Sequence, residues 1–330
     1  MKGNYKIVKL QSVQEKITRY CQFLKYYGVK ATWAYYLGNQ SESKYFDYRR
    51  KLIMTFVRRL REEAKIDNVD NDIVEKNNEF PKIVWVLWQQ GEAQMPKTVK
   101  ASVKTIKEFA KRSGCEFHLL TDENLLCYIS IPKDIIEKNK NKQLSSAAFA
   151  DIVRASLLYE YGGIWMDATL FVSPYATLEM FEGDFFSLNH PPIHPEKMEQ
   201  TISDFKWAGY CLAGKKGKSY FKHIRDIFIY FVRTSPMFIH YLMMDYFILS
   251  EYDSNPEFKR LVDGLPILAP AERVLFLREY ADKPFDENEW EEVLKTTPIM
   301  KTTYKFNKDT IIPGSYRDKL FHGELNNESI

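Results

Sequence analysis

The pattern of apolar and polar positions divides the chain into a helical N-terminal segment, a polar stretch and a longer body. In residues 1–65 apolar side chains recur at helical spacing. They are Ile17, Tyr20, Cys21, Leu24 and Tyr27, followed by Leu52, Phe56, Val57 and Leu60. Residues 66–80 are rich in Asp, Asn and Glu, which is typical of a linker. We therefore expect a helical appendage over residues 1–75 and a main domain over residues 80–330.

In the main domain, strand-like and helix-like patterns alternate. Residues 82–88 form a near-continuous apolar run of strand length, residues 97–112 have helical periodicity, and residues 117–120 read as a second strand. This alternation predicts an α/β domain whose sheet is mainly parallel and binds its ligand beyond the carboxyl ends of the strands. Further strands are expected at 185–188 and 208–213, and further helices at 216–233 and 236–252.

The segment from residue 145 to residue 170 combines a helix, a double glycine, a strand and an acid. Ser145 and Ser146 suit the start of a helix, and Gly162-Gly163 suit its end because glycine accepts the left-handed conformation. Residues 164–166 then read as a short buried strand, with Asp167 at its carboxyl end.

Three charged residues of this segment are expected to share one mouth of the sheet. Asp151 and Arg154 are three apart, so they lie on one helix face, and Asp167 follows the strand. Arginine binds phosphates or sugar hydroxyls, and carboxylates bind sugar hydroxyls or a divalent cation. Each residue alone is commonly structural, as a helix-surface ion pair or a turn residue. The ordered combination favours transfer from a nucleotide sugar, whose leaving diphosphate needs positive charge.

The same segment resembles the signature of glycosyltransferase family 32, in particular its bacterial capsular polysaccharide synthesis branch. The matching residues are Ser146-Ala147-Ala148-Phe149-Ala150-Asp151-Ile152-Val153-Arg154 and Leu158-Tyr159-Glu160-Tyr161-Gly162-Gly163-Ile164-Trp165-Met166-Asp167. The glucosylating clostridial toxins have a similar layout, and the similarity extends over residues 80–305. It implies a GT-A-type (Rossmann-like) mixed sheet flanked by helices. It also implies retaining transfer of a hexose from a nucleotide-diphosphate sugar, such as a UDP-sugar, to a hydroxyl of a growing capsular or exopolysaccharide repeat unit.

The resemblance also implies roles for individual residues. Asp151 and Arg154 would contact the donor sugar, and Asp167 would be the first acid of the D-x-D motif that contacts donor and metal. The implied cofactor is Mn²⁺ or Mg²⁺. Here the motif reads Asp167-Ala168-Thr169. Thr169 could hold a metal-bound water, but a hydroxyl is a weaker ligand than a carboxylate, so metal affinity is in doubt.

Further candidates for nucleotide binding lie at both ends of the main domain. Trp88 in the first strand region is expected to stack on the base, with Trp85 as its rival. Lys301 and Lys305 resemble a late motif of the capsular branch and are expected to close over the diphosphate. A solvated basic strand is an equally good interpretation of the two lysines.

Two residues are weaker candidates for the acceptor site. Asp245 lies in an aromatic helix segment and needs a partner if it is buried. Trp207 precedes an expected strand and would pack on an acceptor sugar. Each also has a structural interpretation, as an ordinary carboxylate and as a core residue.

Charge is distributed unevenly along the 330 residues. Residues 1–65 contain 15 Lys/Arg against 5 Asp/Glu, a net charge of +10, so the remaining residues carry −7 of the total +3. Two interpretations of this basic segment remain open. It rests on an anionic membrane surface or packs on the main domain with its charges solvated, and a combination of the two also fits the pattern. No recognition motif supports nucleic-acid binding.

Cysteine usage and hydropathy bear on location. The four cysteines form no C-x-x-C pair, which is typical of thiols in a reducing compartment. No apolar stretch approaches the ~20 residues of a membrane span. We expect a cytoplasmic protein that lies peripherally on the inner face of the cell membrane and uses a lipid-linked oligosaccharide as acceptor.

Two rival functions differ from transfer of a sugar. The missing second acid would suit a catalytically degenerate sugar-binding or scaffold protein of a polysaccharide assembly complex. A nucleotidyl- or phospho-sugar transferase is disfavoured because no glycine-rich phosphate loop follows the first strand. The sequence leaves the donor open among UDP-galactose, UDP-glucose, an N-acetyl sugar and GDP-mannose, and it names no nucleophile.

Overall fold

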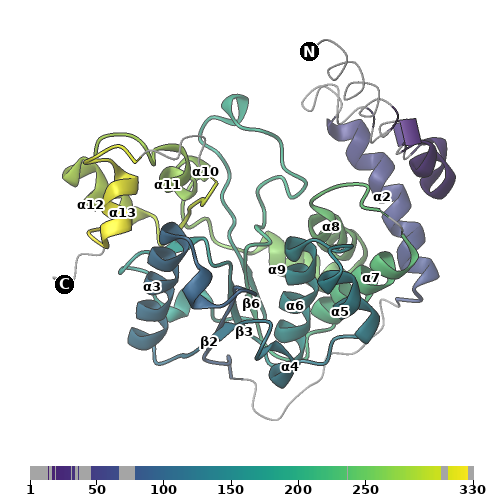
Figure 1. Cartoon of the computed structure of the whole chain (residues 1–330), viewed down its shortest axis with the longest axis horizontal. Coiled ribbons are helices and arrows are strands. Elements are labelled where there is room, and N and C mark those ends of the chain that lie inside the picture. The colour runs from purple at the N-terminus through teal and green to yellow at the C-terminus, as the bar shows by residue number, and fades with distance from the viewer. Residues whose placement is uncertain are drawn as a thin grey trace, which may run out of the picture.

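The structure is a computed structural model in which a mixed sheet separates two groups of helices (Figure 1). It describes residues 14, 17, 18, 20–30, 32, 33, 36, 46–66, 79–235, 237–305 and 311–325. The five strands of the central sheet lie in the order β2-β1-β3-β6-β5. This arrangement confirms the predicted α/β class with a mixed sheet flanked by helices.

The central sheet is parallel on one side and antiparallel on the other. β1 (Ile83–Leu87) pairs in parallel with β2 (Glu116–Leu120) and with β3 (Gly163–Met166). β6 (Cys211–Gly214) is antiparallel to β3 and to β5 (Phe185–Ser187). The sheet is thus less parallel than the alternation of strands and helices suggested, because β5 and β6 follow each other without a crossover helix.

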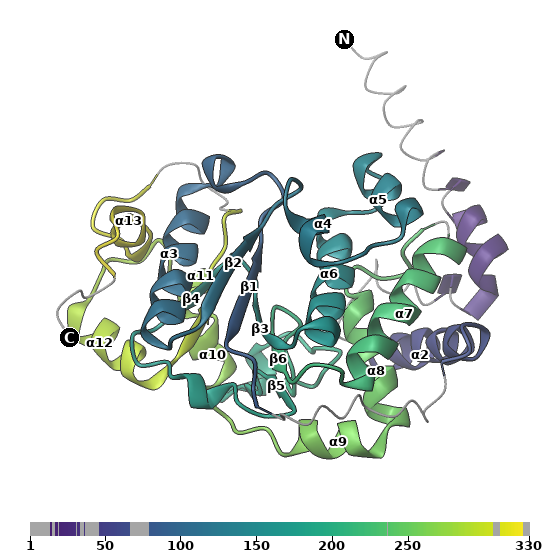
Figure 2. The same ribbon diagram turned by 90° about the horizontal axis from the view of Figure 1, so that it is seen from below.

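Helices cover both faces of the sheet (Figure 2). On one side lies α3 (Lys97–Arg112), and on the other lie α6 (Ser146–Glu160), α7 (Ser219–Thr234) and α8 (Met243–Ser254). Shorter elements are η1 (Glu92–Gln94), α4 (Leu125–Tyr128), α5 (Lys133–Lys140), η2 (Leu178–Met180), η3 (Pro195–Lys197) and α9 (Pro256–Asp263).

The predicted helix and strand limits hold to within about two residues, except at the starts of three elements. One of them is the helix expected at 216–233, which begins at Ser219. The strand expected at 208–213 begins only at Cys211, because the preceding residues form a loop whose backbone serves the site described below. The helix expected at 236–252 begins at Met243. Before it, the carbonyl of Met237 accepts a hydrogen bond from the hydroxyl of Tyr27, so this carbonyl is used by the N-terminal segment and not by a helix.

A second, two-stranded sheet joins distant parts of the chain. β4 (Leu170–Val172) is antiparallel to β7 (Ile299–Lys301), and Leu170 lies opposite Lys301. A separate hydrophobic cluster that includes Phe171 and Trp290 packs beside it. The helices at this end are α10 (Ala271–Val274), α11 (Phe276–Glu279), α12 (Glu287–Thr296) and α13 (Tyr316–His322) (Figure 1).

The double glycine allows α6 to end close against the sheet. Gly162 and Gly163 have φ angles of +69° and +90°, which favour glycine. A Cβ at Gly163 would lie 2.5 Å from the carbonyl oxygen of Ile83, and one at Gly162 would lie 2.6 Å from the amide nitrogen of Lys216. Only glycine therefore lets β3 begin beside β1 at this point.

Helix α2 (Phe46–Glu63) packs against α7 and α8 at the end opposite α12 (Figure 1). It buries Ile53, Val57 and Leu60 in the main hydrophobic cluster. Of the two interpretations of the basic segment, the structure therefore has packing on the main domain for α2. The predicted division between 1–75 and 80–330 falls outside the described residues and stays a prediction. Within the described part of the chain, no helix combines the length and apolarity that crossing a membrane requires.

Candidate functional site

The charged residues of the 145–170 segment meet at the carboxyl end of β3. Helix α6 begins at a Ser145 cap, whose side chain accepts a hydrogen bond from the amide of Ala148. From this helix, Nη2 of Arg154 lies 3.1 Å from Oδ1 of Asp151 and 3.4 Å from Oδ1 of Asp167. The structure thus brings the three predicted residues together, and their catalytic roles remain predictions.

Two further groups fix the orientation of Arg154 and Asp167. The guanidinium carbon of Arg154 lies 5.1 Å from the ring centroid of Trp165, and its Nη1 donates to the carbonyl of Gly209. Nε1 of Trp165 donates to Oδ1 of Asp167 at 3.1 Å. Because Trp165 is buried in the sheet and Gly209 is half-buried in the loop before β6, the charged atoms are held in place before any ligand arrives.

The second sheet brings Lys301 to the same cluster. Its Nζ lies 3.1 Å from Oδ2 of Asp167 and 4.5 Å from the ring centroid of Tyr210. Lys305 is exposed, and its Nζ lies 5.8 Å from the ring centroid of Tyr304. Of the two predicted lysines, Lys301 is therefore the one that pairs with Asp167.

The loop before β6 connects the cluster with α8. Oδ1 of Asp245 accepts a hydrogen bond from Nε1 of Trp207 at 3.0 Å. Trp207 is only 2% exposed, so its ring packs in the core. In the same loop the carbonyl of Tyr210 accepts from the amide of Asp167 at 2.9 Å. The loop thus holds Asp245 on one side and the end of β3 on the other.

The two tryptophans predicted to stack on the base differ in exposure. Trp85 is 1% exposed, and its ring stacks on His118 with centroids 4.8 Å apart. Its Nε1 donates to the carbonyl of Gly162 at 3.0 Å, which ties β1 to the double glycine. Trp88 is half-buried and meets Tyr304 edge-on at 5.7 Å. Trp88 therefore keeps part of its ring surface accessible to a ligand.

Burial changes the protonation of two carboxyl groups near Arg154. It raises the pKa of Asp151 to about 7, against the opposing charge of Arg154 and with added repulsion from Asp245 and Asp167. Burial also raises the pKa of Asp245 to about 6, although the Trp207 hydrogen bond and Arg154 oppose it. Both groups hold protons at a higher pH than ordinary aspartates.

Asp167 behaves in the opposite way. Burial acts to raise its pKa, but Lys301 and Arg154, with the hydrogen bonds from Trp165 and Lys301, outweigh burial and hold the pKa below its usual value. Burial lowers the pKa of Lys301, while Asp167 counteracts the change. Asp167 is accordingly the ionised acid of the cluster.

The implied divalent metal does not fit these side chains as they lie. Among the described residues no group of three or more His, Cys, Asp or Glu could hold a metal ion. Oδ2 of Asp167 pairs with Lys301, Oδ1 faces Trp165 and Arg154, and the second acid position is Thr169. Two unit charges 4 Å apart near a protein surface interact by about 4 kcal/mol, and a divalent ion doubles this repulsion from Lys301.

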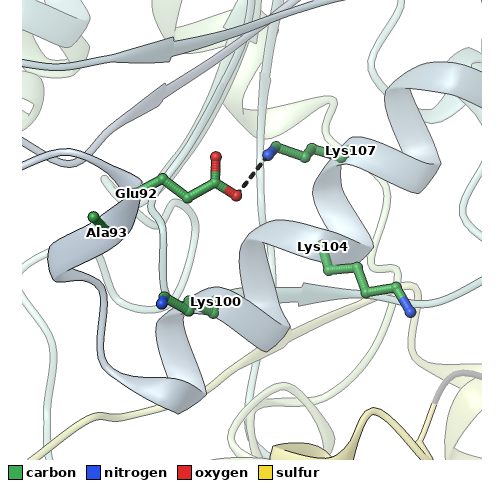
Figure 3. Close-up of a pocket in the computed structure, with 5 residues that line it drawn as sticks. All are labelled: Glu92, Ala93, Lys100, Lys104 and Lys107. Atoms are coloured by element: carbon green, nitrogen blue, oxygen red, sulfur yellow. Dashed lines mark hydrogen bonds and ion pairs between the residues drawn. The ribbon is translucent and has the colours of Figure 1, made fainter.

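A hollow between α3 and η1 is separate from the charged cluster at the end of β3 (Figure 3). It measures about 380 Å³ and is lined by Glu92, Ala93, Lys100, Lys104 and Lys107. Lys107 pairs with Glu92 at 2.9 Å. None of the predicted site residues lines this hollow, so the geometry at the end of β3 carries the functional argument.

Sequence reasoning missed the groups that orient the charged residues. Trp165 could have been found, because residues two apart on a strand point to the same face and Trp165 is two residues before Asp167. The carbonyl groups of Gly209 and Tyr210 had no such signal, because every residue carries a carbonyl.

The chain is similar to a solved structure described as "PaToxG Glycosyltransferase", with 14% sequence identity and a TM-score of 0.35 over 76% of this chain and 95% of that chain. No curated protein shows a significant match. The family model described as "Capsular polysaccharide synthesis protein" matches residues 31–320. The chain therefore belongs to the capsular polysaccharide synthesis protein family.

Proposed function

We propose that this protein is a glycosyltransferase that moves a hexose from a nucleoside-diphosphate sugar to a hydroxyl of a growing capsular or exopolysaccharide repeat unit. The observation that carries the proposal is the contact of Arg154 with both Asp151 and Asp167, with Lys301 on the far oxygen of Asp167. Cations suit the leaving diphosphate, and carboxylates suit the sugar hydroxyls. Membership of the family supports a polysaccharide as the product.

Each residue has a role in this proposal. Asp151 and Asp167 accept hydrogen bonds from hydroxyls of the donor sugar, and Arg154 binds the sugar and the phosphate next to it. Lys301 faces the diphosphate. Trp88 stacks on the base, preferably of a UDP-sugar, because Trp85 is committed to the core. We assign a GT-A-type site and retention of configuration, with the leaving phosphate accepting the proton of the acceptor hydroxyl.

The acceptor side is proposed on fewer contacts. Asp245 is half-buried and contacts the same loop of residues 207–210 that Arg154 contacts, so it is our candidate for an acceptor contact. Trp207 positions Asp245 through its Nε1 hydrogen bond. The acceptor in this proposal is a lipid-linked oligosaccharide, and the basic residues 1–65 touch the anionic inner face of the membrane.

The test is release of nucleoside diphosphate from a panel of UDP- and GDP-sugars, in the presence of the oligosaccharide acceptor. Asp167→Asn is expected to lower the rate by at least ~100-fold, since it removes the ionised acid of the cluster. Asp226→Asn, on the exposed side of α7, is the control and should keep the wild-type rate. A wild-type rate in Asp167→Asn would contradict the assigned site, and an inverted anomeric product would contradict retention.

A second candidate function is that of a catalytically degenerate sugar-binding or scaffold protein. Thr169 in place of the second acid favours it. Such a protein would bind nucleotide sugars or oligosaccharide without ever releasing nucleoside diphosphate. Measuring binding and turnover on the same preparation distinguishes the two candidates.

A further inference from the structure

Both oxygens of the Asp167 carboxylate face positively charged side chains. We propose that Lys301 and Arg154 supply, as fixed charges, the positive charge that the donor diphosphate needs, so that this transferase works without a divalent metal. The inference rests on the proposed function, because it names the groups that bind the diphosphate of that donor.

The first support is the geometry around Asp167. Its Oδ2 lies 3.1 Å from Nζ of Lys301, and its Oδ1 lies 3.4 Å from Nη2 of Arg154. Where a second carboxylate would complete a metal site, the chain has Thr169. A metal bound to Asp167 would have to displace an ammonium group that is itself largely buried, with 18% of its side chain exposed.

The second support is how firmly Lys301 is held. Lys301 is the last residue of β7, which pairs with β4, and β4 begins three residues after Asp167. The next residue, Thr302, donates through its amide and its hydroxyl to the carbonyl of Thr169 at 2.8 and 2.9 Å. Its hydroxyl also lies 3.1 Å from that of Ser102 in α3. A cation fixed in this way stabilises developing charge without reorganisation during the reaction.

Arg154 is held equally firmly from the other side. It contacts the carbonyl of Gly209, and its guanidinium lies over the ring of Trp165. The two cations thus flank Asp167 from different elements, Arg154 from α6 and Lys301 from β7. A diphosphate that enters beside Asp167 meets an ammonium and a planar guanidinium, which binds two oxygens at once.

In the transfer step the charges balance without a metal. The bond between the anomeric carbon and the diphosphate oxygen breaks, and its electron pair stays on the leaving diphosphate, next to Lys301 and Arg154. The acceptor oxygen forms the new bond to the anomeric carbon. Its proton passes to the leaving phosphate.

The test is calorimetric binding of UDP, GDP and dTDP to the full chain, once in EDTA and once in Mn²⁺. We expect at least one of them to bind in EDTA, with an affinity that Mn²⁺ changes by less than about threefold. Lys301→Met should weaken this binding by more than about tenfold, since a hydrogen bond to a charged group is lost. The matched control is Lys295→Met, on the exposed side of α12.

Different failures have different meanings. Binding that requires Mn²⁺, or Lys301→Met that binds as the wild type does, would overturn the inference and leave the proposed function standing. No binding of any of the three in either buffer would overturn the proposed function as well. The comparison of buffers uses the wild-type protein, so it shows whether binding needs a divalent metal even if Lys301→Met fails to fold.

A gain of metal dependence provides a second test. The double variant Thr169→Asp with Lys301→Ala restores the second acid and removes the cation that repels a metal. We expect its nucleoside diphosphate binding to become stronger in Mn²⁺ than in EDTA, unlike that of the wild type. Equal effects of Mn²⁺ on both proteins would count against Lys301 as the substitute for the metal.

Discussion

Three aspartates lie around one arginine, yet their environments give them different charges. Asp167 has two cations beside it and a lowered pKa, whereas burial raises the pKa of Asp151 to about 7 and that of Asp245 to about 6. At Asp151 and Asp245 burial outweighs the opposing charge of Arg154, whereas at Asp167 Lys301 acts together with Arg154 and outweighs burial. The net charge of the cluster therefore changes between about pH 6 and pH 7.

The raised pKa of Asp151 predicts how folding stability depends on pH. Its ordinary value is 3.8 and its folded value is about 7, so the folded state binds more protons between pH 4 and pH 7. This contribution to the free energy of unfolding is present at low pH and is lost as the pH rises through 7. Asp151→Asn removes the dependence. We expect its stability relative to that of the wild type to rise by about 2–3 kcal/mol between pH 5 and pH 8, because each pH unit below the folded pKa is worth about 1.4 kcal/mol.

Urea denaturation of both proteins at pH 5 and pH 8 measures this difference. If Asp151→Asn differed from the wild type by the same free energy at both values, Asp151 would not hold the proton.

The planar fork of Arg154 predicts that lysine cannot replace it. Arg154 reaches Asp151 and Asp167 with Nη2 and the carbonyl of Gly209 with Nη1, while an ammonium is a single point charge. We expect Arg154→Lys to lower donor turnover by about 100-fold or more. Arg225→Lys is a matched control, because Arg225 also lies over an aromatic ring and pairs with an acid, but on α7 away from the site. Similar losses in both variants would show that Arg154 acts only through folding.

At the scale of elements, the junction between α6 and β3 decides whether the site forms. The two glycines allow α6 to end at Glu160 and β3 to begin at Gly163, with only two residues between them, which brings Asp151 and Asp167 to the same end of the sheet. The indole nitrogen of Trp85 donates to the carbonyl of Gly162, so β1 also holds this junction. A substitution at this junction therefore alters the geometry of the charged cluster, although the substituted residue does not contact the charged side chains.

Gly163→Ala is expected to destabilise the protein by about 3 kcal/mol or more. The left-handed backbone alone costs about 1–2 kcal/mol for alanine, and the new Cβ would also lie 2.5 Å from the carbonyl of Ile83. Gly114→Ala separates the two effects, because Gly114 also has a positive φ but its Cβ would meet nothing within 4 Å. Equal losses in denaturant midpoints for both variants would exclude a role for the contact with β1.

At the scale of the whole molecule, α2 is joined to the body by a buried ion pair. Nη1 of Arg61 lies 2.7 Å from Oε2 of Glu251, and the side chain of Glu251 is 0% exposed. Nδ1 of His223 lies 3.1 Å from the other oxygen of Glu251. The basic N-terminal segment is thus held to the helices that form one wall of the site, at least along α2.

Removing this link should cost more than removing an arginine pair at the surface. Arg61→Met leaves the carboxylate of Glu251 buried without its arginine partner, which typically costs about 3 kcal/mol. Arg58 pairs with Asp253 at 3.4 Å with both side chains exposed, so Arg58→Met should cost about 0.5 kcal/mol or less. Hydrogen exchange of α2 amides and denaturant unfolding measure both variants. A loss no larger in Arg61→Met than in Arg58→Met would mean that apolar packing alone holds α2.

The sequence predicts the central sheet and its main helices well, because long apolar runs and regular spacing read directly as buried elements. β1 and α3 appear within a residue or two of their expected limits. β4 was not predicted, because three apolar residues after a turn are too short a pattern. The resemblance named Lys301, but only the pairing of β4 with β7 shows which carboxylate it meets.

The pairing of β4 with β7 also has a consequence for synthesis of the protein. Asp151, Arg154 and Asp167 leave the ribosome together, but Lys301 follows 134 residues after Asp167. Until then the nascent chain carries an acid at the end of β3 that no lysine from β7 neutralises. A partly made protein therefore cannot assemble the complete site. The positive charge of Lys301 joins the cluster around Asp167 only when β7 pairs with β4.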